Sequence, residues 1–230
     1  MRTPTHLIAL GLGAALLMAA PAPATPKAEA PRTMIYSSAE EIEPLEAGDT
    51  VPHPVFLRDK EGSPVILRSV LEGKGRTVLV FYRGGWCPYC NNQLAGLAVV
   101  QEELERHGVE VIAFSPDRPQ KIAGYMEERE LPYTILSDSA GTAMAAFGVG
   151  FTVDGETVEQ LRGYGLDLAE WSGHERNILP VPAVFVVNEE QEIVFAHAEP
   201  DYTKRLGREE LLRAAGIGQA EEEQEQTETE

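Results

Sequence analysis

The chain has 230 residues, of which 43% are hydrophobic and 24% charged, and its formal net charge is -18. This acidic surplus argues against nucleic acids and anionic membranes as partners, because phosphate binding needs clustered Lys and Arg. The two cysteines, Cys87 and Cys90, are too few for a scaffold held together by disulfides.

Residues 1–24 are typical of a signal peptide. Arg2 gives a positive start, residues 7–20 form an apolar run, and Ala22 and Ala24 have the Ala-x-Ala spacing of a cleavage site. Spanning a bilayer takes about 20 apolar residues, and this run is shorter. We therefore expect an exported protein, periplasmic or secreted, without an integral membrane segment after cleavage; an uncleaved anchor is the alternative.

Composition divides the remaining chain into three parts. Residues 25–47 are rich in Ala, Pro and Glu without a sustained period, which predicts a linker or an extended arm. Residues 48–218 contain enough Val, Leu, Ile and Phe to close one core, which predicts a single domain. Residues 219–230 are mostly Glu, Gln and Thr, and such a segment predicts a disordered acidic tail.

The first half of the domain begins with two short apolar segments around the turn at 59–62, which predict a hairpin. Residues 77–82 form a β-branched and aromatic run, typical of a strand buried on both faces of a parallel sheet. Helical spacing follows Cys90 and stops at 107–108, and residues 109–114 predict a second buried strand. Strand, helix and strand in this order predict a βαβ unit.

The second half mixes helical and strand patterns with a stretch that is hard to interpret. Residues 151–180 contain several Gly and aromatic residues and no stable period, which predicts an inserted loop with a short helix. The other expected elements are a helix at 120–130, a strand at 133–136, a small helix through Phe147 capped by Asp138 or Ser139, an antiparallel hairpin at 183–196 and a last helix at 208–215.

The segment 82–90, with the sequence YRGGWCPYC, lies where a buried strand becomes a helix. Free N–H groups and the helix dipole at a helix N-terminus stabilise a thiolate and lower the thiol pKa. We expect Cys87 to lie there, partly exposed, as the nucleophile, with Pro88 in the first turn. Cys90 is one turn further on the same face, so it is the predicted resolving thiol that attacks a mixed disulfide or sulfenic acid on Cys87.

Other interpretations of the cysteine pair stay open. A structural disulfide that closes so short a loop gains little stability. Zinc needs about four ligands, and the sequence has no second Cys pair and no closely spaced His pair. Copper held by two thiolates and a distant His is a further possibility. His174 is the histidine that we single out, although no partner spacing supports it. No cofactor is predicted, since a redox dithiol needs none.

These residues resemble the thioredoxin-fold superfamily, and within it the peroxiredoxin-like branch of the AhpC/TSA family, over about residues 48–215. The segment 86–90 is highly specific for a thioredoxin-type site. The turn at 59–62, the segment 136–149 and the strand 183–187 match the family in this order. The resemblance implies an α/β protein with a thioredoxin-like fold, in which helices flank a central mixed sheet and an N-terminal β-hairpin extends it.

For function, the resemblance implies an antioxidant thiol oxidoreductase that reduces hydroperoxides through a dithiol–disulfide cycle of Cys87 and Cys90. Its partners would be a hydroperoxide or disulfide substrate and a thiol donor, such as a thioredoxin-like protein or a low-molecular-weight thiol. Trp86 and Tyr89 would shape the apolar rim around the nucleophile. By analogy, Pro182 would be a cis-proline beside the cysteines; a trans-proline that opens a strand is the alternative.

The sequence departs from the peroxiredoxin pattern at three positions. Peroxiredoxins generally have a Pro seven residues and a Thr or Ser three residues before the nucleophile, and an Arg at the start of the penultimate strand. In this sequence these three positions are occupied by Val80, Gly84 and Pro182, respectively. Arg83 is a candidate for the missing positive charge, with a solvated loop residue as the alternative, and Arg205 is a second candidate.

The tetrad at 87–90 is also that of glutaredoxins, which keeps two other functions open. One is a thiol–disulfide oxidoreductase that acts on protein disulfides. The other is a copper-handling protein with a thioredoxin fold. Fold resemblance by itself does not choose among these.

Overall fold

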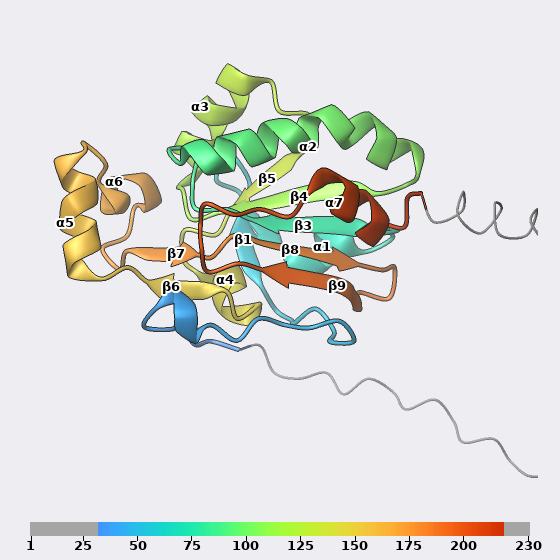
Figure 1. Cartoon of the computed structure of the whole chain (residues 1–230), viewed down its shortest axis with the longest axis horizontal. Helices are drawn as coiled ribbons and strands as arrows, with labels where there is room; N and C mark the ends of the chain where they lie inside the picture. Colours follow the sequence, from blue (N-terminus) through green and yellow to red (C-terminus); the bar gives the residue numbers. More distant parts are fainter. Residues whose placement is uncertain (1–31, 219–230) are drawn as a thin grey trace, which may run out of the picture.

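The computed structural model describes residues 32–218 (Figure 1). The expected signal peptide, the first part of the expected arm at 25–31 and the expected acidic tail lie outside the described residues. Between residues 32 and 218, no helix is long and apolar enough to cross a membrane.

A seven-stranded mixed sheet forms the centre of the molecule, with strand order β2-β1-β5-β4-β3-β8-β9. Its strands are β1 (Phe56–Arg58), β2 (Pro64–Ile66), β3 (Thr77–Phe81), β4 (Glu110–Ser115), β5 (Thr134–Ser137), β8 (Ala183–Val187) and β9 (Ile193–Ala198). β3 and β4 pair in parallel, as do β4 and β5, whereas β8 runs antiparallel to both β3 and β9. Every residue of β3 and β8 is buried, which explains their continuous apolar runs.

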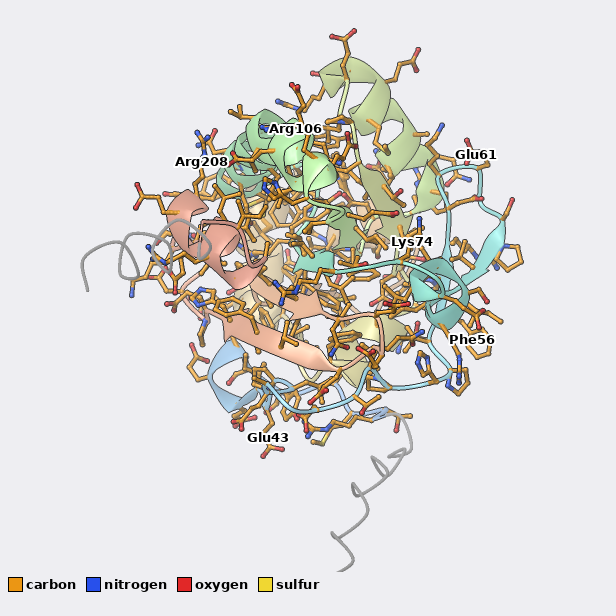
Figure 2. All side chains as sticks on the ribbon, turned by 90° about the vertical axis from the view of Figure 1, so that its right-hand side faces the viewer. Glu43, Phe56, Glu61, Lys74, Arg106 and Arg208 are labelled. Carbon is orange, nitrogen blue, oxygen red and sulfur yellow. The ribbon has the colours of Figure 1, made fainter. Side chains whose placement is uncertain are left out.

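The predicted N-terminal hairpin is confirmed: β1 and β2 pair antiparallel, and β1 joins β5 at the edge of the parallel strands. Asp59 closes the turn, because its Oδ1 accepts the N–H groups of Glu61 and Ser63. Side chains alternate along β1. Leu57 is buried, and its neighbour Phe56 is 55% exposed and lies at the outer edge of the molecule in Figure 2.

Helices cover both faces of the sheet. They are α1 (Leu67–Leu71), α2 (Pro88–Arg106), α3 (Pro119–Arg129), α4 (Thr142–Ala146) and α7 (Arg208–Ala214). Alternate residues of β3 enter two different cores: Val80 packs in a cluster with residues of α2, α3 and α7, whereas Phe81 packs in one with residues of α1 and α4. In Figure 1, α2, α3 and α7 lie above the sheet. These layers make the predicted thioredoxin-like fold.

Residues 32–47, for which we expected a linker or an extended arm, lie along the domain (Figure 1). They contain one short 3-10 helix, η1 (Ala39–Glu41). The N–H of Tyr36 donates to the carbonyl of Gly150 at 3.0 Å, and the N–H of Leu45 donates to that of Phe147 at 3.1 Å. Leu45 is buried in the core cluster that contains Phe147. Apolar burial and backbone pairing therefore hold this segment against the domain.

The segment 151–180 is more ordered than the predicted loop with a short helix. It contributes β6 (Gly150–Thr152), α5 (Gly155–Gly163), α6 (Leu168–Ser172) and β7 (Ile178–Pro180). β6 and β7 pair antiparallel as a separate two-stranded sheet. Four buried residues form a small core of its own: Val153, Val158, Leu168 and Leu179. The prediction was incomplete because so few apolar positions give no clear period.

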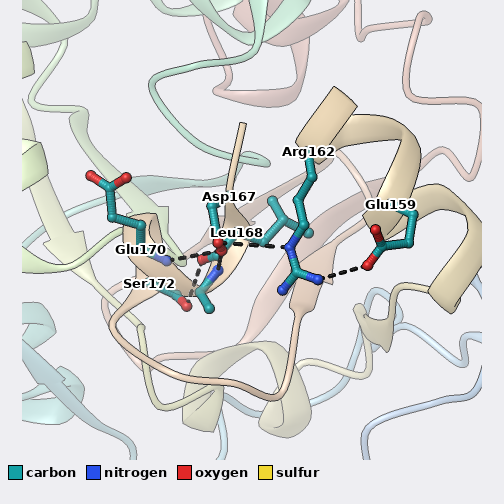
Figure 3. Close-up of polar contacts among 7 residues, drawn as sticks. Glu159, Arg162, Asp167, Leu168, Glu170 and Ser172 are labelled. Carbon is teal, nitrogen blue, oxygen red and sulfur yellow. Dashed lines mark hydrogen bonds and ion pairs between the residues drawn. The ribbon is translucent and has the colours of Figure 1, made fainter. Parts of the chain in front are cut away.

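Aspartate side chains cap the N-termini of both helices in the segment 151–180. Asp154 accepts the N–H of Thr157 at 2.8 Å at the start of α5, and Asp167 accepts the N–H of Ala169 at 2.9 Å at the start of α6. Figure 3 shows Arg162 between the two helices, paired with Glu159 at 2.7 Å and with Asp167 at 3.7 Å. The second pair joins α5 to the cap of α6.

Candidate active site

The loop between β3 and α2 turns sharply at Gly84, which has φ 136°, a conformation that L side chains rarely adopt. The turn is closed by the N–H of Cys87, which donates to the carbonyl of Gly84 at 3.1 Å. A Cβ at position 84 would lie 2.3 Å from Nε1 of Trp86 and 2.8 Å from Oδ1 of Asp117. Glycine is therefore required here by both conformation and space.

The predicted position of the dithiol at the N-terminus of a helix is confirmed. Cys87 is the N-cap residue of α2, and Pro88 occupies the first helical position. The first backbone bond of the helix runs from the N–H of Asn91 to the carbonyl of Cys87 at 3.0 Å. Cys90 lies one turn further, and both cysteines are free thiols. The thiolate of Cys87 can thus interact with the positive end of the helix dipole.

The expectation that Cys87 is partly exposed is wrong. Cys87 is 2% exposed and Cys90 is 0% exposed. Both sulfurs belong to the apolar cluster beneath α2, together with Tyr82, and Trp86 packs against that cluster. A reactant therefore reaches Cys87 only when covering side chains move.

The two thiols differ in acidity because they are coupled. A hydrogen bond from the Cys90 thiol to the Cys87 sulfur lowers the pKa of Cys87 to about 6, against the opposing effect of burial. The guanidinium groups of Arg83 and Arg205 make smaller contributions to the same lowering. The same hydrogen bond and burial raise the pKa of Cys90. Cys87 is therefore the thiolate at neutral pH, and Cys90 keeps its proton.

Alkylation of Cys87 by iodoacetamide is expected to follow this acidity. Since the thiolate is the reactive form, the rate should be constant above about pH 7 and fall about tenfold per pH unit below about pH 6. Quenched-flow mass spectrometry of the Cys87 peptide measures this alkylation rate at each pH. Cys90→Ala removes the hydrogen bond and should move the midpoint upward; a midpoint near 8.5 in the wild type would contradict the coupling.

Arg83 is buried, at 8% exposed, so it is not the solvated loop residue of the alternative interpretation. Its guanidinium carbon lies 4.1 Å from the ring centroid of Tyr202 and 5.3 Å from that of Trp86. Cation–π contact with two rings holds this charge in the active-site loop. From this position the guanidinium lowers the pKa of Cys87 electrostatically.

Arg205, the second candidate, reaches the site from the segment 199–206 between β9 and α7, which we call the cover segment. Its Nη2 lies 3.3 Å from the Sγ of Cys90. In the same segment, the ring of Tyr202 makes an edge contact with that of Tyr89 at 5.9 Å between centroids. Tyr89 is itself 46% exposed, and its role in a rim around Cys87 stays a prediction.

The expectation that the peptide bond before Pro182 is cis is also wrong. Within residues 32–218 the cis bond is His53–Pro54, and Val181–Pro182 is trans. Pro182 directly precedes β8 and needs no N–H there, and its carbonyl accepts the N–H of Glu199 at 3.0 Å. Pro182 still borders the site: it lines a cleft of about 270 Å³ together with Arg83 and Tyr202.

His174 is not part of this site. It is exposed just after α6, and its backbone N–H donates to Oγ of Ser172 at 3.1 Å. In the part of the chain that the structure describes, no group of three or more His, Cys, Asp or Glu side chains is arranged to hold a metal ion.

Asp117 is a residue of the site that the sequence pattern did not predict. This side chain is 2% exposed, and its Oδ2 accepts the N–H of Gly85, in the active-site loop, at 2.7 Å. Burial raises the pKa of its carboxyl to about 7. A signal existed, because Asp117 follows β4, and the carboxyl ends of neighbouring parallel strands meet at one edge of the sheet.

Asp117→Asn is expected to change how stability depends on pH. A raised carboxyl pKa contributes stability that is present below about pH 4 and lost as the pH rises through about 7. Asn cannot ionise, so from pH 5 to pH 8 the variant should gain about 2–3 kcal/mol of unfolding free energy relative to the wild type. Urea unfolding at both pH values measures this, and equal pH slopes for the two proteins would contradict a buried titrating carboxyl.

The layered sheet and the helix-start dithiol define the class of the protein, a thioredoxin-like redox protein. The model of the AhpC/TSA family matches residues 47–196, which is more than half of the chain. The chain belongs to the AhpC/TSA family. It is a thiol-dependent oxidoreductase.

Sequence relatives agree with this membership, and a solved structure agrees with the fold. Peroxiredoxin Bcp of Escherichia coli (strain K12) is 36% identical over 109 residues, 47% of this chain and 67% of that protein. Peroxiredoxin Q, chloroplastic, of Sedum lineare is 32% identical over 101 residues, 44% of this chain and 53% of that protein. The crystal structure of peroxidoxin BcpB from Mycobacterium tuberculosis has a TM-score of 0.57 at 23% identity, covering 75% of this chain and 95% of that one.

Proposed function

We propose that this protein reduces hydroperoxides through a dithiol–disulfide cycle of Cys87 and Cys90. The observation that carries the proposal is the position of Cys87 at the N-cap of α2 with Cys90 one turn further on the same helix, and the lowered pKa of Cys87 agrees with it. The peroxiredoxins among the relatives support the same reaction.

In the first step, the Cys87 thiolate attacks the terminal oxygen of the hydroperoxide. A sulfur–oxygen bond forms and the O–O bond breaks, so that sulfur is oxidised to a sulfenic acid and the leaving alkoxide takes up a proton to become an alcohol. No hydroxyl stands at position 84 to orient the peroxide. The buried charge of Arg83 beside the loop takes the electrostatic part of that role.

In the second step, Cys90 attacks the sulfenic acid, the disulfide forms and water leaves. An external thiol donor then reduces the disulfide by way of a mixed disulfide. We propose a thioredoxin-like protein or a low-molecular-weight thiol as the donor. Both kinds of donor have to reach a disulfide that lies beneath the cover segment. Donor attack therefore requires local opening around Cys87.

The second candidate function is exchange with protein disulfides. It is favoured by the Cys-Pro-Tyr-Cys tetrad at a helix start and by the absence of a hydroxyl side chain at Gly84. In this case Cys87 attacks a substrate disulfide and Cys90 releases the reduced substrate. Peroxide turnover is not part of that cycle.

Three measurements on the purified full chain separate these two functions and the copper-handling alternative. We expect hydroperoxide consumption that requires a thiol donor, measured by loss of peroxide at fixed protein concentration. Insulin reduction without peroxide consumption would replace the proposal by the second candidate. Stoichiometric copper in the untreated sample, with neither activity, would point to the copper-handling function instead.

We also propose that the protein is exported to the periplasm or secreted. The proposal is supported by the charged start, apolar run and Ala-x-Ala spacing of residues 1–24. Mass spectrometry of the mature protein should find an N-terminus near residue 25. A full-length chain in the cytoplasmic fraction would contradict export.

A further inference from the structure

The resolving thiol has a charged neighbour that the reaction described above does not use. Cys90 is fully buried, and Nη2 of Arg205 lies 3.3 Å from its Sγ. A sulfur accepts a hydrogen bond at this distance, and it does so more strongly as a thiolate than as a thiol. The guanidinium is thus placed at the reacting atom of the second step.

Arg205 is held in this orientation by its own segment. Its Nη1 donates to the backbone carbonyls of Tyr202 and Lys204. Its Nε is buried without a hydrogen-bond partner in the described structure. Tyr202 in turn packs on the Arg83 guanidinium and on the ring of Tyr89. Arg205 as a whole is half-buried, but leaving a buried donor unpaired is costly, which argues for a role beyond packing.

We propose that Arg205 is a catalytic residue of the resolution step, in which its guanidinium stabilises the Cys90 thiolate while that sulfur attacks the sulfenic acid of Cys87. This inference rests on the proposed function. The S–S bond forms, the S–O bond breaks, and the departing hydroxide is protonated to water by the proton that Cys90 has lost. The Cys90 sulfur is oxidised and the Cys87 sulfur is reduced.

The need for this charge follows from the surroundings of Cys90. In the dithiol state, the hydrogen bond to the Cys87 thiolate, burial and repulsion by that thiolate keep Cys90 protonated. Oxidation of Cys87 to a neutral sulfenic acid removes the repulsion, but burial still opposes ionisation. The other groups that interact with Cys90 are a backbone hydrogen bond at Arg83 and the Tyr125 side chain. Arg205 is the cation in contact with the sulfur.

A single-turnover experiment tests the proposal. Reduced wild type, Arg205→Gln, Arg205→Lys and the matched control Lys204→Gln are mixed with one equivalent of H₂O₂, and mass spectrometry follows dimedone-trapped sulfenic acid and the intramolecular disulfide. In Arg205→Gln, disulfide formation should be about ten- to a hundredfold slower, as expected for loss of a charge-assisted hydrogen bond. The peroxide step should change less than about threefold, since Arg205 is a minor influence on Cys87.

The other variants separate charge from shape. Arg205→Lys keeps the charge and should recover part of the disulfide rate, whereas Lys204→Gln should behave as wild type because its side chain is exposed in the same segment. With excess peroxide, Arg205→Gln should accumulate sulfinic acid at Cys87, since its sulfenic acid persists longer. Unchanged disulfide formation in Arg205→Gln would overturn the proposal and leave the peroxidase function intact.

A second measurement needs no peroxide. Reaction with 5,5′-dithiobis(2-nitrobenzoate) places a thionitrobenzoate group on Cys87, and attack by Cys90 releases that group with a change in absorbance. Release should be slowed in Arg205→Gln by a factor similar to that in the peroxide experiment. Normal release in this variant would also overturn the proposal, whereas slowed release in a protein that consumes no peroxide would refute only the peroxidase function.

Discussion

Cys87→Ser is expected to abolish peroxide consumption, with a loss on the order of 10³-fold or more, because no other described thiol stands at a helix start. Serine at this position is not ionised near neutral pH and does not replace the thiolate. Cys90→Ser should behave differently. It keeps the nucleophile, so that about one equivalent of peroxide is consumed in a burst before turnover stops.

Stopped-flow measurement of peroxide loss, with a thiol donor present, distinguishes the two variants. Circular dichroism checks that both have the fold of the wild type. Turnover by Cys87→Ser at a rate near that of the wild type would remove Cys87 from the chemistry. Loss of the burst in a folded Cys90→Ser protein would mean that the first oxidation needs both thiols.

Gly84→Thr is expected to damage the protein, although peroxiredoxins generally have a Thr or Ser at this position. At φ 136° and with Trp86 and Asp117 so close, the new side chain would strain the backbone and displace the active-site loop. We expect the unfolding free energy to fall by about 2–4 kcal/mol and peroxide consumption to fall about tenfold or more.

Urea unfolding and the peroxide assay measure these effects, with Gly84→Ala as a smaller step in the same direction. Gly96→Ala is the matched control, since a Cβ on Gly96 in α2 meets nothing within 4 Å. The Gly96→Ala substitution should raise the unfolding free energy by about 0.5–1 kcal/mol. A stable Gly84→Thr variant with faster peroxide consumption would show that the loop accepts the peroxiredoxin pattern.

Local chemistry in the sequence determined most of the fold. The apolar run at 77–82 predicted β3, and the helical spacing after Cys90 with a stop at 107–108 predicted α2. Asp138 or Ser139 was predicted to cap α4; the N-cap residue is Gly141, and it is the Asp138 carboxylate that accepts the N–H groups of Ala143 and Met144. Each of these signals lies within a few residues of the element that it predicts. The position of Cys87 at the start of α2 followed from the same local patterns.

Short elements and the burial of the site were decided by tertiary packing. α1 was not predicted, because five residues are too few to show a helical period, and the small core of the segment 151–180 gave no period either. Cys87 was expected to be partly exposed, but it is 2% exposed, and Trp86 packs against the apolar cluster that contains its sulfur. Burial depends on what covers a residue, which local patterns do not describe.

The charges of the site come from distant parts of the chain. Arg205 contacts Cys90 across 115 positions of sequence, and Asp117 binds Gly85 across 32. The sequence by itself determined which residues could carry the chemistry and which helix would present them. The packing of the sheet, of α2 and of the cover segment decided which charge lies beside which sulfur, because only folding sets distances between residues so far apart in the chain.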